Sequence, residues 1–374
     1  MYKTDFLKLQ NELDNTVVNP HILVSKQSSP NTRKLFEYLK SIYGRGILAG
    51  QQYLQSAELE DRVYWKAAGK LPAVRGYDMM DIDKKKGDNQ VERALDWARS
   101  SGCILTFCWH WYAPDDMENI ENSCWSFYYK TTQYNHKTSF DIINAVDEGT
   151  PEYAFVISRI DRVAEILKRF ADEDIPILWR PLHEANGNWF WWGNRGNDNG
   201  ESTEAYKKLW YIIFDRLENY HKLTNLIWVW NGQHKNMAVH PNTYDICGED
   251  IYSTVKNDHS SQKEKFLEVT SYTSNKMATL SECGYIPSPK NLKEDNVNWL
   301  WWLPWWGEFV YKSKNWHPVF DENGCPVINE KYMTEQYLRE AFSDDYCITL
   351  DKLPWYSEKN DLYVKNAMSN TEKD

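Results

Sequence analysis

The chain has 374 residues, of which 42% are hydrophobic and 26% are charged. This composition excludes a disordered chain and suffices for one large core. The formal net charge is -11 and the one short basic run is Lys84, Lys85 and Lys86, so we expect no nucleic-acid partner.

The N-terminal residues MYKTDFLKLQNELDN lack the apolar segment of a signal peptide. The location therefore stays open. The protein is cytoplasmic as the sequence stands, or it is secreted, periplasmic or at the cell surface if a leader was removed. No apolar run reaches about 18 residues, so we expect no membrane span. The seven Cys residues include no CxxC pair, which argues against a full disulfide framework.

Short apolar runs recur along the chain, and each ends in polar or aromatic residues. They are ILAGQQ (47–52), AVRGYDM (73–79), CILTFCWHW (103–111), PILWRPLHE (176–184), LIWVWNG (226–232), YDICGEDIY (244–252), MATLSECG (277–284) and NWLWWLPWWGEF (298–309). Near-continuous apolar runs of this length are typical of strands buried on both faces of a parallel sheet.

Helical patterns separate several of these runs. They occupy 156–173, 203–223, 261–275 and 333–345. For the second helix we expect Ser202 or Thr203 as the N-cap residue. Alternating strands and helices, with eight strand-like runs, predict an α/β fold and more narrowly a (β/α)8 TIM barrel.

We expect one domain over 1–374, with the barrel over approximately 46–345 and enlarged βα loops. About 65 residues separate the third and fourth runs, and 112–150 is predicted to be an insertion on the catalytic face. Only about a dozen residues separate the fifth and sixth runs, which is short for a crossover helix. The polar tail 366–374 is expected to fray.

The carboxyl ends of barrel strands carry the catalytic groups of such folds. Two isolated acids, Glu184 and Glu282, end the fourth and seventh runs among Trp, Tyr, His and Asn side chains. Glycoside hydrolysis needs one carboxylic acid to protonate the glycosidic oxygen and a second carboxylate to attack or stabilise the anomeric carbon. The pair therefore predicts a glycoside hydrolase.

Tryptophan is unusually frequent, with 19 residues that gather in clusters. A barrel core prefers Val, Ile and Leu, so the excess needs another explanation. Because an aromatic face packs well against the C–H face of a sugar ring, we expect the clusters to form stacking surfaces for a saccharide.

Longer motifs give a more specific indication. WRPLHEANGNWFWWG (179–193) together with TLSECG (279–284) resembles glycoside hydrolase family 26, and FCWHW (107–111) and GEDIY (248–252) match further segments in the same order. The resemblance covers roughly Gly46 to Phe309. It implies a retaining hydrolase with Glu184 as the acid/base and Glu282 as the nucleophile.

The same resemblance implies that His110, Trp189 and Tyr252 line the subsite where the sugar is attacked. We expect further substrate contacts from neighbouring residues at the strand ends. These are Trp111, His183, Trp192, Asn231, Asp250 and Trp305.

The family resemblance favours an endo-β-1,4-mannanase, whose partner is a β-mannan chain or a related oligosaccharide. Four alternatives stay open: a β-1,3-1,4-glucanase, a β-1,3-xylanase, a sugar-binding protein without catalysis, and an exo-acting mannobiohydrolase. For the last of these, the segments 112–150 and 299–306 would block one end of the cleft. His183–Glu184 lacks the second His of a zincin motif, and GxSxG and phosphate-binding glycine loops are absent. We therefore expect no metal and no cofactor, and we expect a monomer.

Overall fold

The structure, a computed structural model, describes residues 2–54, 58–82, 90–130, 132–197 and 199–370. The basic run 84–86 and the last four residues of the tail lie outside these ranges.

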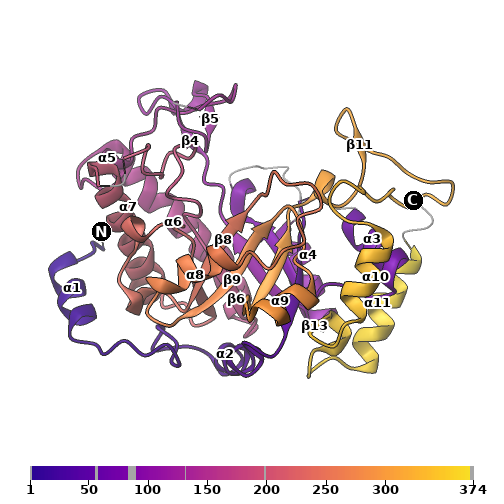
Figure 1. Cartoon of the computed structure of the whole chain (residues 1–374). Coiled ribbons are helices and arrows are strands. Elements are labelled where there is room, and N and C mark those ends of the chain that lie inside the picture. Colours follow the sequence, from indigo (N-terminus) through magenta and orange to yellow (C-terminus); the bar gives the residue numbers. More distant parts are fainter. Residues whose placement is uncertain (1, 55–57, 83–89, 131, 198, 371–374) are drawn as a thin grey trace.

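Parallel strands close into a barrel at the centre of the molecule (Figure 1). They are β1 (Ile47–Gln52), β2 (Val74–Asp78), β3 (Ile104–Cys108), β6 (Ile177–Arg180), β7 (Leu226–Trp230), β8 (Ile246–Ile251), β9 (Met277–Cys283) and β10 (Trp301–Pro304). Each lies within one predicted run, and β10 pairs with β1 to complete the circle. The predicted TIM barrel is therefore confirmed. A short strand, β13 (Cys347–Ile348), pairs in parallel with the start of β1.

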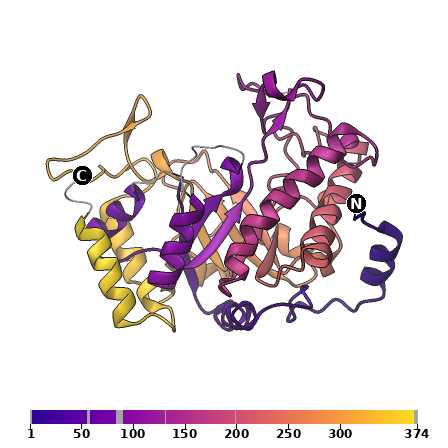
Figure 2. The ribbon, with the colours of Figure 1, turned by 180° about the vertical axis from the view of Figure 1, so that it is seen from behind.

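Helices cover the barrel, and they gather on two sides of it in both views (Figures 1 and 2). One side carries α3 (Leu59–Ala68), α4 (Gln90–Ser101), α10 (Glu335–Ser343) and α11 (Glu358–Asn370), and the other carries α1 (Phe6–Asp14), α5 (Ile142–Ala145), α6 (Pro151–Ala171) and α7 (Glu201–Asp215). The remaining α-helices are α2 (Pro30–Ile42), α8 (Lys263–Ser271) and α9 (Pro289–Asp295). None of the helices described is long and apolar enough to cross a membrane.

Short helical turns complete the connections. They are η1 (Met79–Asp81), η2 (Ile120–Asn122), η3 (Arg216–Tyr220), η4 (Lys235–Met237), η5 (Pro241–Thr243), η6 (Gly307–Phe309) and η7 (Leu350–Lys352). The short link between β7 and β8 holds η4 and η5 where other units carry a longer helix, in agreement with its length.

One predicted helix end is wrong. Helix α7 begins after Gly200, because the hydroxyls of Ser202 and Thr203 donate to the carbonyls of Asn194 and Asn197 and so do not cap the helix. The tail is helical through residue 370, because α11 buries apolar side chains against the body.

The long loops rise from the end of the barrel where the strands finish (Figure 1). Segment 112–150 contains the strand pair β4 (Ala113–Pro114) and β5 (Trp125–Ser126), followed by α5. The hairpin of β11 (Ser313–Lys314) and β12 (His317–Pro318) rises at the same end on the opposite side. All seven Cys residues carry free thiols.

Most tryptophans belong to the core, which corrects the expectation that their clusters form stacking surfaces. The fully buried indoles are Trp109, Trp111, Trp179, Trp191, Trp192, Trp210, Trp228, Trp230, Trp299, Trp301 and Trp302. Their wide rings fill space between strands and helices that smaller side chains would leave empty.

Candidate active site

A cavity of about 630 Å³ opens at the carboxyl ends of the barrel strands. Seven of the predicted site residues line it: His110, Glu184, Trp189, Asp250, Tyr252, Glu282 and Trp305. The other lining residues are Leu54, Asp78, Met80, Phe127, Tyr128, Tyr134, Phe190, Gln233, Trp306 and Phe309. This mixture of acids and aromatic walls is typical of a saccharide-binding cleft.

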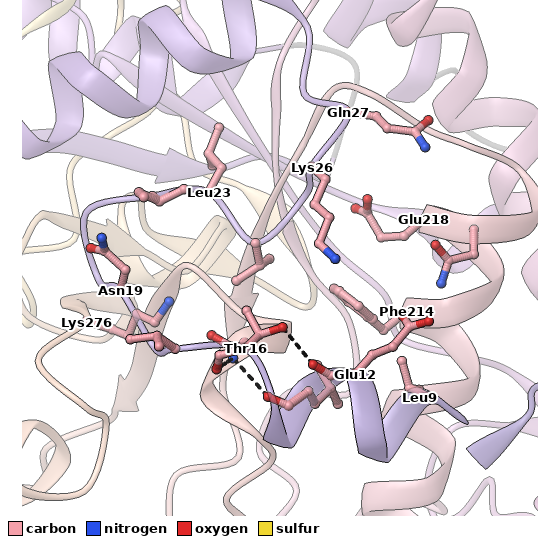
Figure 3. Close-up of a pocket in the computed structure, with 16 residues that line it drawn as sticks. Leu9, Glu12, Thr16, Asn19, Leu23, Lys26, Gln27, Phe214, Glu218 and Lys276 are labelled. Atoms are coloured by element: carbon pink, nitrogen blue, oxygen red, sulfur yellow. Dashed lines mark hydrogen bonds between the residues drawn. The ribbon is translucent and has the colours of Figure 1, made fainter. Parts of the chain in front are cut away.

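A second cavity, of about 270 Å³, lies between the N-terminal arm 9–27 and the end of α7 (Figure 3). Glu218, on η3, and Lys276 line it together with residues of the arm. The Glu218 carboxylate accepts a hydrogen bond of 2.7 Å from the indole N–H of Trp228, which gives it a structural role. We therefore place the candidate site in the first cavity.

Three carboxyl groups meet in that cavity. Glu184, Asp250 and Glu282 each offer a carboxylate oxygen, and these three oxygens lie within 4.8 Å of one another. Asp250 on β8 pairs in register with Glu282 on β9, while Glu184 follows β6. The spacing suits a retaining glycosidase, whose two carboxyl groups lie about 5 to 5.5 Å apart.

Glu184 sits in a strained turn. Its φ of 54° and the φ of 52° at Leu182 lie in the left-handed region, which costs about 1 to 3 kcal/mol per non-glycine residue. The Glu184 N–H donates to both the carbonyl (2.8 Å) and the side-chain oxygen (2.9 Å) of Asn231. The indole N–H of Trp189 donates to the Glu184 carboxylate at 2.8 Å. These bonds hold the acid at the edge of the cavity.

Glu282 is held by two donors. The buried Arg180 guanidinium bonds one Glu282 oxygen and also donates to Asp250 at 2.9 Å. The Tyr252 hydroxyl donates to the second Glu282 oxygen at 2.7 Å. Both contacts stabilise the carboxylate form of Glu282, the form needed for nucleophilic attack.

Electrostatics separate the two Glu residues. Burial, with the nearby Asp250 and Glu282 charges, raises the pKa of Glu184 well above its usual range. Burial and Asp250 also raise the pKa of Glu282, but Arg180, His110 and Tyr252 oppose this rise. Glu184 is therefore the group that keeps its proton while Glu282 ionises, which is the division of roles that glycoside hydrolysis uses.

A histidine pair forms another part of the site. The ring atom His110 Nδ1 lies 2.6 Å from Asp78 Oδ2, and the backbone N–H of His110 donates to Asp78 Oδ1 at 3.0 Å. The Nε2 atoms of His110 and His183 are 3.3 Å apart. Burial, together with the charges of His110 and Arg180, lowers the pKa of His183 well below its usual range, so His183 is neutral.

Four predicted substrate contacts lie behind the cavity wall. Trp111 is 1% exposed and stacks on Trp109 at 3.8 Å, and Trp192 is 0% exposed with its indole N–H on the His183 carbonyl. His183 and Asn231 are buried as well. These four side chains are not among those that line the cavity, so their direct contact with substrate stays a prediction.

Arg180 was not predicted as a site residue. The sequence places it four residues before Glu184, and residues four apart on an extended strand share a face. Its actual partners, Asp250 and Glu282, lie on β8 and β9. The arginine in WRPLHE, which ends the strand that precedes the acid, was the available signal.

Two residue sets in the described chain have the donor spacing of a cation site: Glu184 with Asp250 and Glu282, and Asp78 with Cys108 and His110. In the first set Arg180 already pairs with Asp250 and Glu282. In the second set His110 Nδ1 is bonded to Asp78. Both sets therefore have a structural explanation within the protein.

Comparison with known proteins gives a consistent result. The family model described as glycosyl hydrolase family 26 matches residues 24–322. The chain is 34% identical over 359 residues to mannan endo-1,4-beta-mannosidase B of Piromyces sp, covering 92% of this chain and 55% of the relative. It is 31% identical over 356 residues to a mannan endo-1,4-beta-mannosidase of Thermothelomyces thermophilus, covering 93% of this chain and 65% of the relative. The chain thus spans about half to two thirds of these relatives.

Solved structures show the same similarity. A GH26-CBM35 beta-(1,4)-mannanase of Podospora anserina superposes with a TM-score of 0.74 at 32% identity, covering 90% of this chain and 70% of that one. A beta-mannanase from a symbiotic protist of the termite Reticulitermes speratus gives a TM-score of 0.75 at 27% identity, covering 90% of this chain and 98% of that one.

Proposed function

The chain belongs to glycosyl hydrolase family 26, and from this premise we propose that it is a retaining endo-β-1,4-mannanase. The observation that carries the proposal is the pair Glu184 and Glu282, whose carboxylate oxygens lie within 4.8 Å at the carboxyl ends of the strands. The mannanase names of the relatives above support mannan as the substrate.

In the first step Glu184 donates its proton to the glycosidic oxygen while Glu282 attacks the anomeric carbon. The bond from the anomeric carbon to the leaving oxygen breaks, and an ester between the sugar and Glu282 forms. Arg180 and Tyr252 stabilise the ionised Glu282 before the attack. The raised pKa of Glu184 keeps its proton available near neutral pH.

In the second step the charge on Glu282 is gone, because its carboxylate has become an ester. The repulsion that raised the pKa of Glu184 falls, so Glu184 becomes able to take a proton from water. The water oxygen attacks the anomeric carbon, the ester bond breaks, and Glu282 leaves as a carboxylate. Two displacements at one carbon retain its configuration.

The walls of the cavity suit a β-mannan chain or a mannan oligosaccharide. Trp189 and Trp305 line it together with the acids, and His110 and Asp250 add polar groups. We propose that these side chains and Tyr252 contact the sugar. One similar structure is described as complexed with gluco-manno-oligosaccharide, which supports glucomannan as a further substrate. All these residues come from one chain, so we also propose that one domain acts as a monomer.

Activity assays test this proposal. The wild-type chain is expected to release oligosaccharides from mannan and glucomannan, with little release from barley β-glucan or β-1,3-xylan. Glu184→Ala and Glu282→Ala should lose nearly all activity on mannan while staying folded. A wild-type chain that hydrolyses none of these polymers would contradict an enzymatic function, and disaccharide as the sole product would instead indicate exo-action.

A further inference from the structure

A ladder of parallel aromatic rings runs from the core to the cleft. Tyr134 stacks on Tyr128 with ring centres 3.9 Å apart and planes at 20°. Tyr128 stacks on Phe190 at 5.9 Å and 18°, and Phe190 stacks on Trp192 at 4.4 Å and 21°. Trp192 is fully buried, whereas Tyr134 keeps 44% of its surface exposed. We call these four rings the aromatic ladder.

The ladder joins the insertion 112–150 to the loop that carries Glu184. The N–H of Tyr129 donates to the Trp189 carbonyl at 2.7 Å, and the N–H of Trp191 donates to the Phe127 carbonyl at 3.1 Å. Two backbone bonds and a continuous ring stack thus fix the insertion against this loop. The outer ring, Tyr134, therefore has a defined position relative to the acid/base.

That position is on the Glu184 side of the cleft. Tyr128, Tyr134 and Glu184 line the same cavity. The pKa of Tyr128 is raised by burial, by its contact with Tyr134 and by the charge of Glu184, which agrees with a short separation from that acid. The carboxyl of Glu282, by contrast, is bonded to Tyr252, whose ring packs on Phe309.

We propose that Tyr134, held in place by Tyr128, is the stacking surface for the sugar on the leaving-group side of the bond that is cut. One face of the Tyr134 ring is covered by Tyr128, so its exposure comes from the other face and the edge. A flat aromatic face of this kind suits the C–H face of a sugar. The acid must lie beside the leaving oxygen, and the sugar attached to that oxygen therefore lies on the Glu184 side.

This inference rests on the proposed mannanase activity. It adds that the insertion recognises the sugar on the leaving-group side of the bond that is cut. It has a consequence for the second step, because a sugar acceptor binds where the leaving sugar was. The acceptor hydroxyl oxygen then bonds to the anomeric carbon, the ester to Glu282 breaks, and Glu184 takes the hydroxyl proton. Tyr134 should favour this transfer over hydrolysis by water.

The test compares two substrates of the full chain. Mannotetraose needs a bound leaving sugar, whereas a nitrophenyl β-mannobioside carries an activated leaving group without one. In Tyr134→Ala the ratio of kcat/KM for mannotetraose to that for the nitrophenyl glycoside should fall about tenfold, the effect expected for one lost aromatic contact. Tyr134→Leu keeps apolar volume without a flat face and should show the same fall, and Tyr134→Phe should restore most of the ratio.

Tyr220→Ala is the matched control, since Tyr220 is 46% exposed and lies on η3, outside the residues that line the catalytic cavity. It should leave the ratio unchanged. The products with added mannobiose as acceptor give a second measurement, in which Tyr134→Ala should lower the fraction of transfer products severalfold. An equal loss on both substrates, or an unchanged ratio and transfer fraction, would overturn the assignment. A wild type inactive on both substrates would instead refute the proposed function, before any variant is compared.

Discussion

Replacing Tyr252 by Phe removes one hydrogen bond from the proposed nucleophile and leaves the Arg180 contact in place. The Tyr252 hydroxyl donates to Glu282 at 2.7 Å, and this bond lowers the pKa of Glu282. Without it the carboxylate is less stable, so the pKa of Glu282 rises. Because attack needs the ionised form, the acid limb of the pH profile of kcat/KM should move to higher pH.

The size of the shift follows from the burial of the two partners. A hydrogen bond to a charged group contributes about 1.5 to 3 kcal/mol. Glu282 is 3% exposed, but Tyr252 is 40% exposed, so water replaces part of the lost bond. We take the lower limit, about 1.5 kcal/mol, which corresponds to about one pKa unit. On the acid limb kcat/KM should then fall about tenfold, with a much smaller change on the plateau.

The assay is the pH dependence of kcat/KM for a nitrophenyl β-mannobioside. Tyr134→Phe provides the control, because it is the same change in the same cavity without a bond to Glu282. Its acid limb should keep the wild-type midpoint. If Tyr252→Phe lowers kcat/KM equally at every pH, the hydroxyl acts on the sugar and the reasoning about Glu282 is refuted.

Three further predictions concern the surroundings of the acids. Trp189→Phe removes the donor that lowers the pKa of Glu184, so the alkaline limb, where Glu184 loses its proton, should move to higher pH in the same assay; a limb that stays in place would count against this role. Asn231→Ala removes an acceptor of the strained Glu184 turn and should lower the free energy of unfolding by about 1 to 3 kcal/mol in urea titrations; unchanged stability would show that the turn needs no such support. Trp111→Ala should lower the free energy of unfolding by about 3 to 5 kcal/mol and leave KM for mannotetraose nearly unchanged. A large rise in KM in the folded variant would show instead that Trp111 contacts the substrate.

The barrel was predictable because its strands are buried on both faces. Burial of this kind gives continuous apolar runs, and β1 and β9, for example, are buried along their whole length. The acids were predictable for a related reason, since strand ends meet at one face of a barrel and specific motifs surround Glu184 and Glu282.

The direction of individual side chains was harder to predict. His110 and Trp111 are neighbours at the end of one predicted run, yet His110 lines the cavity and Trp111 packs in the core. Neighbouring residues of an extended segment point to opposite faces, so proximity to a catalytic residue in sequence does not give contact with substrate. Because Trp suits both a core and a sugar surface, its residue type could not decide between them.

Contacts between distant segments set the rest of the site. Arg180 stands near Glu184 in the sequence, but barrel closure brings its guanidinium to Asp250 and Glu282. The insertion 112–150 has no regular period, so the stacking of Tyr134 on Tyr128 was outside the reach of pattern analysis. Such contacts depend on loop conformation, which the local sequence specifies weakly.

Trapping the covalent intermediate tests the central claim most directly. In Glu184→Ala, a dinitrophenyl β-mannobioside has a leaving group good enough to depart without the acid, while the second step lacks its base. The account predicts that the glycosyl–enzyme accumulates and that mass spectrometry of the digested protein finds the disaccharide on the peptide containing Glu282. A label on Asp250, or hydrolysis with inverted configuration and no label, would contradict it.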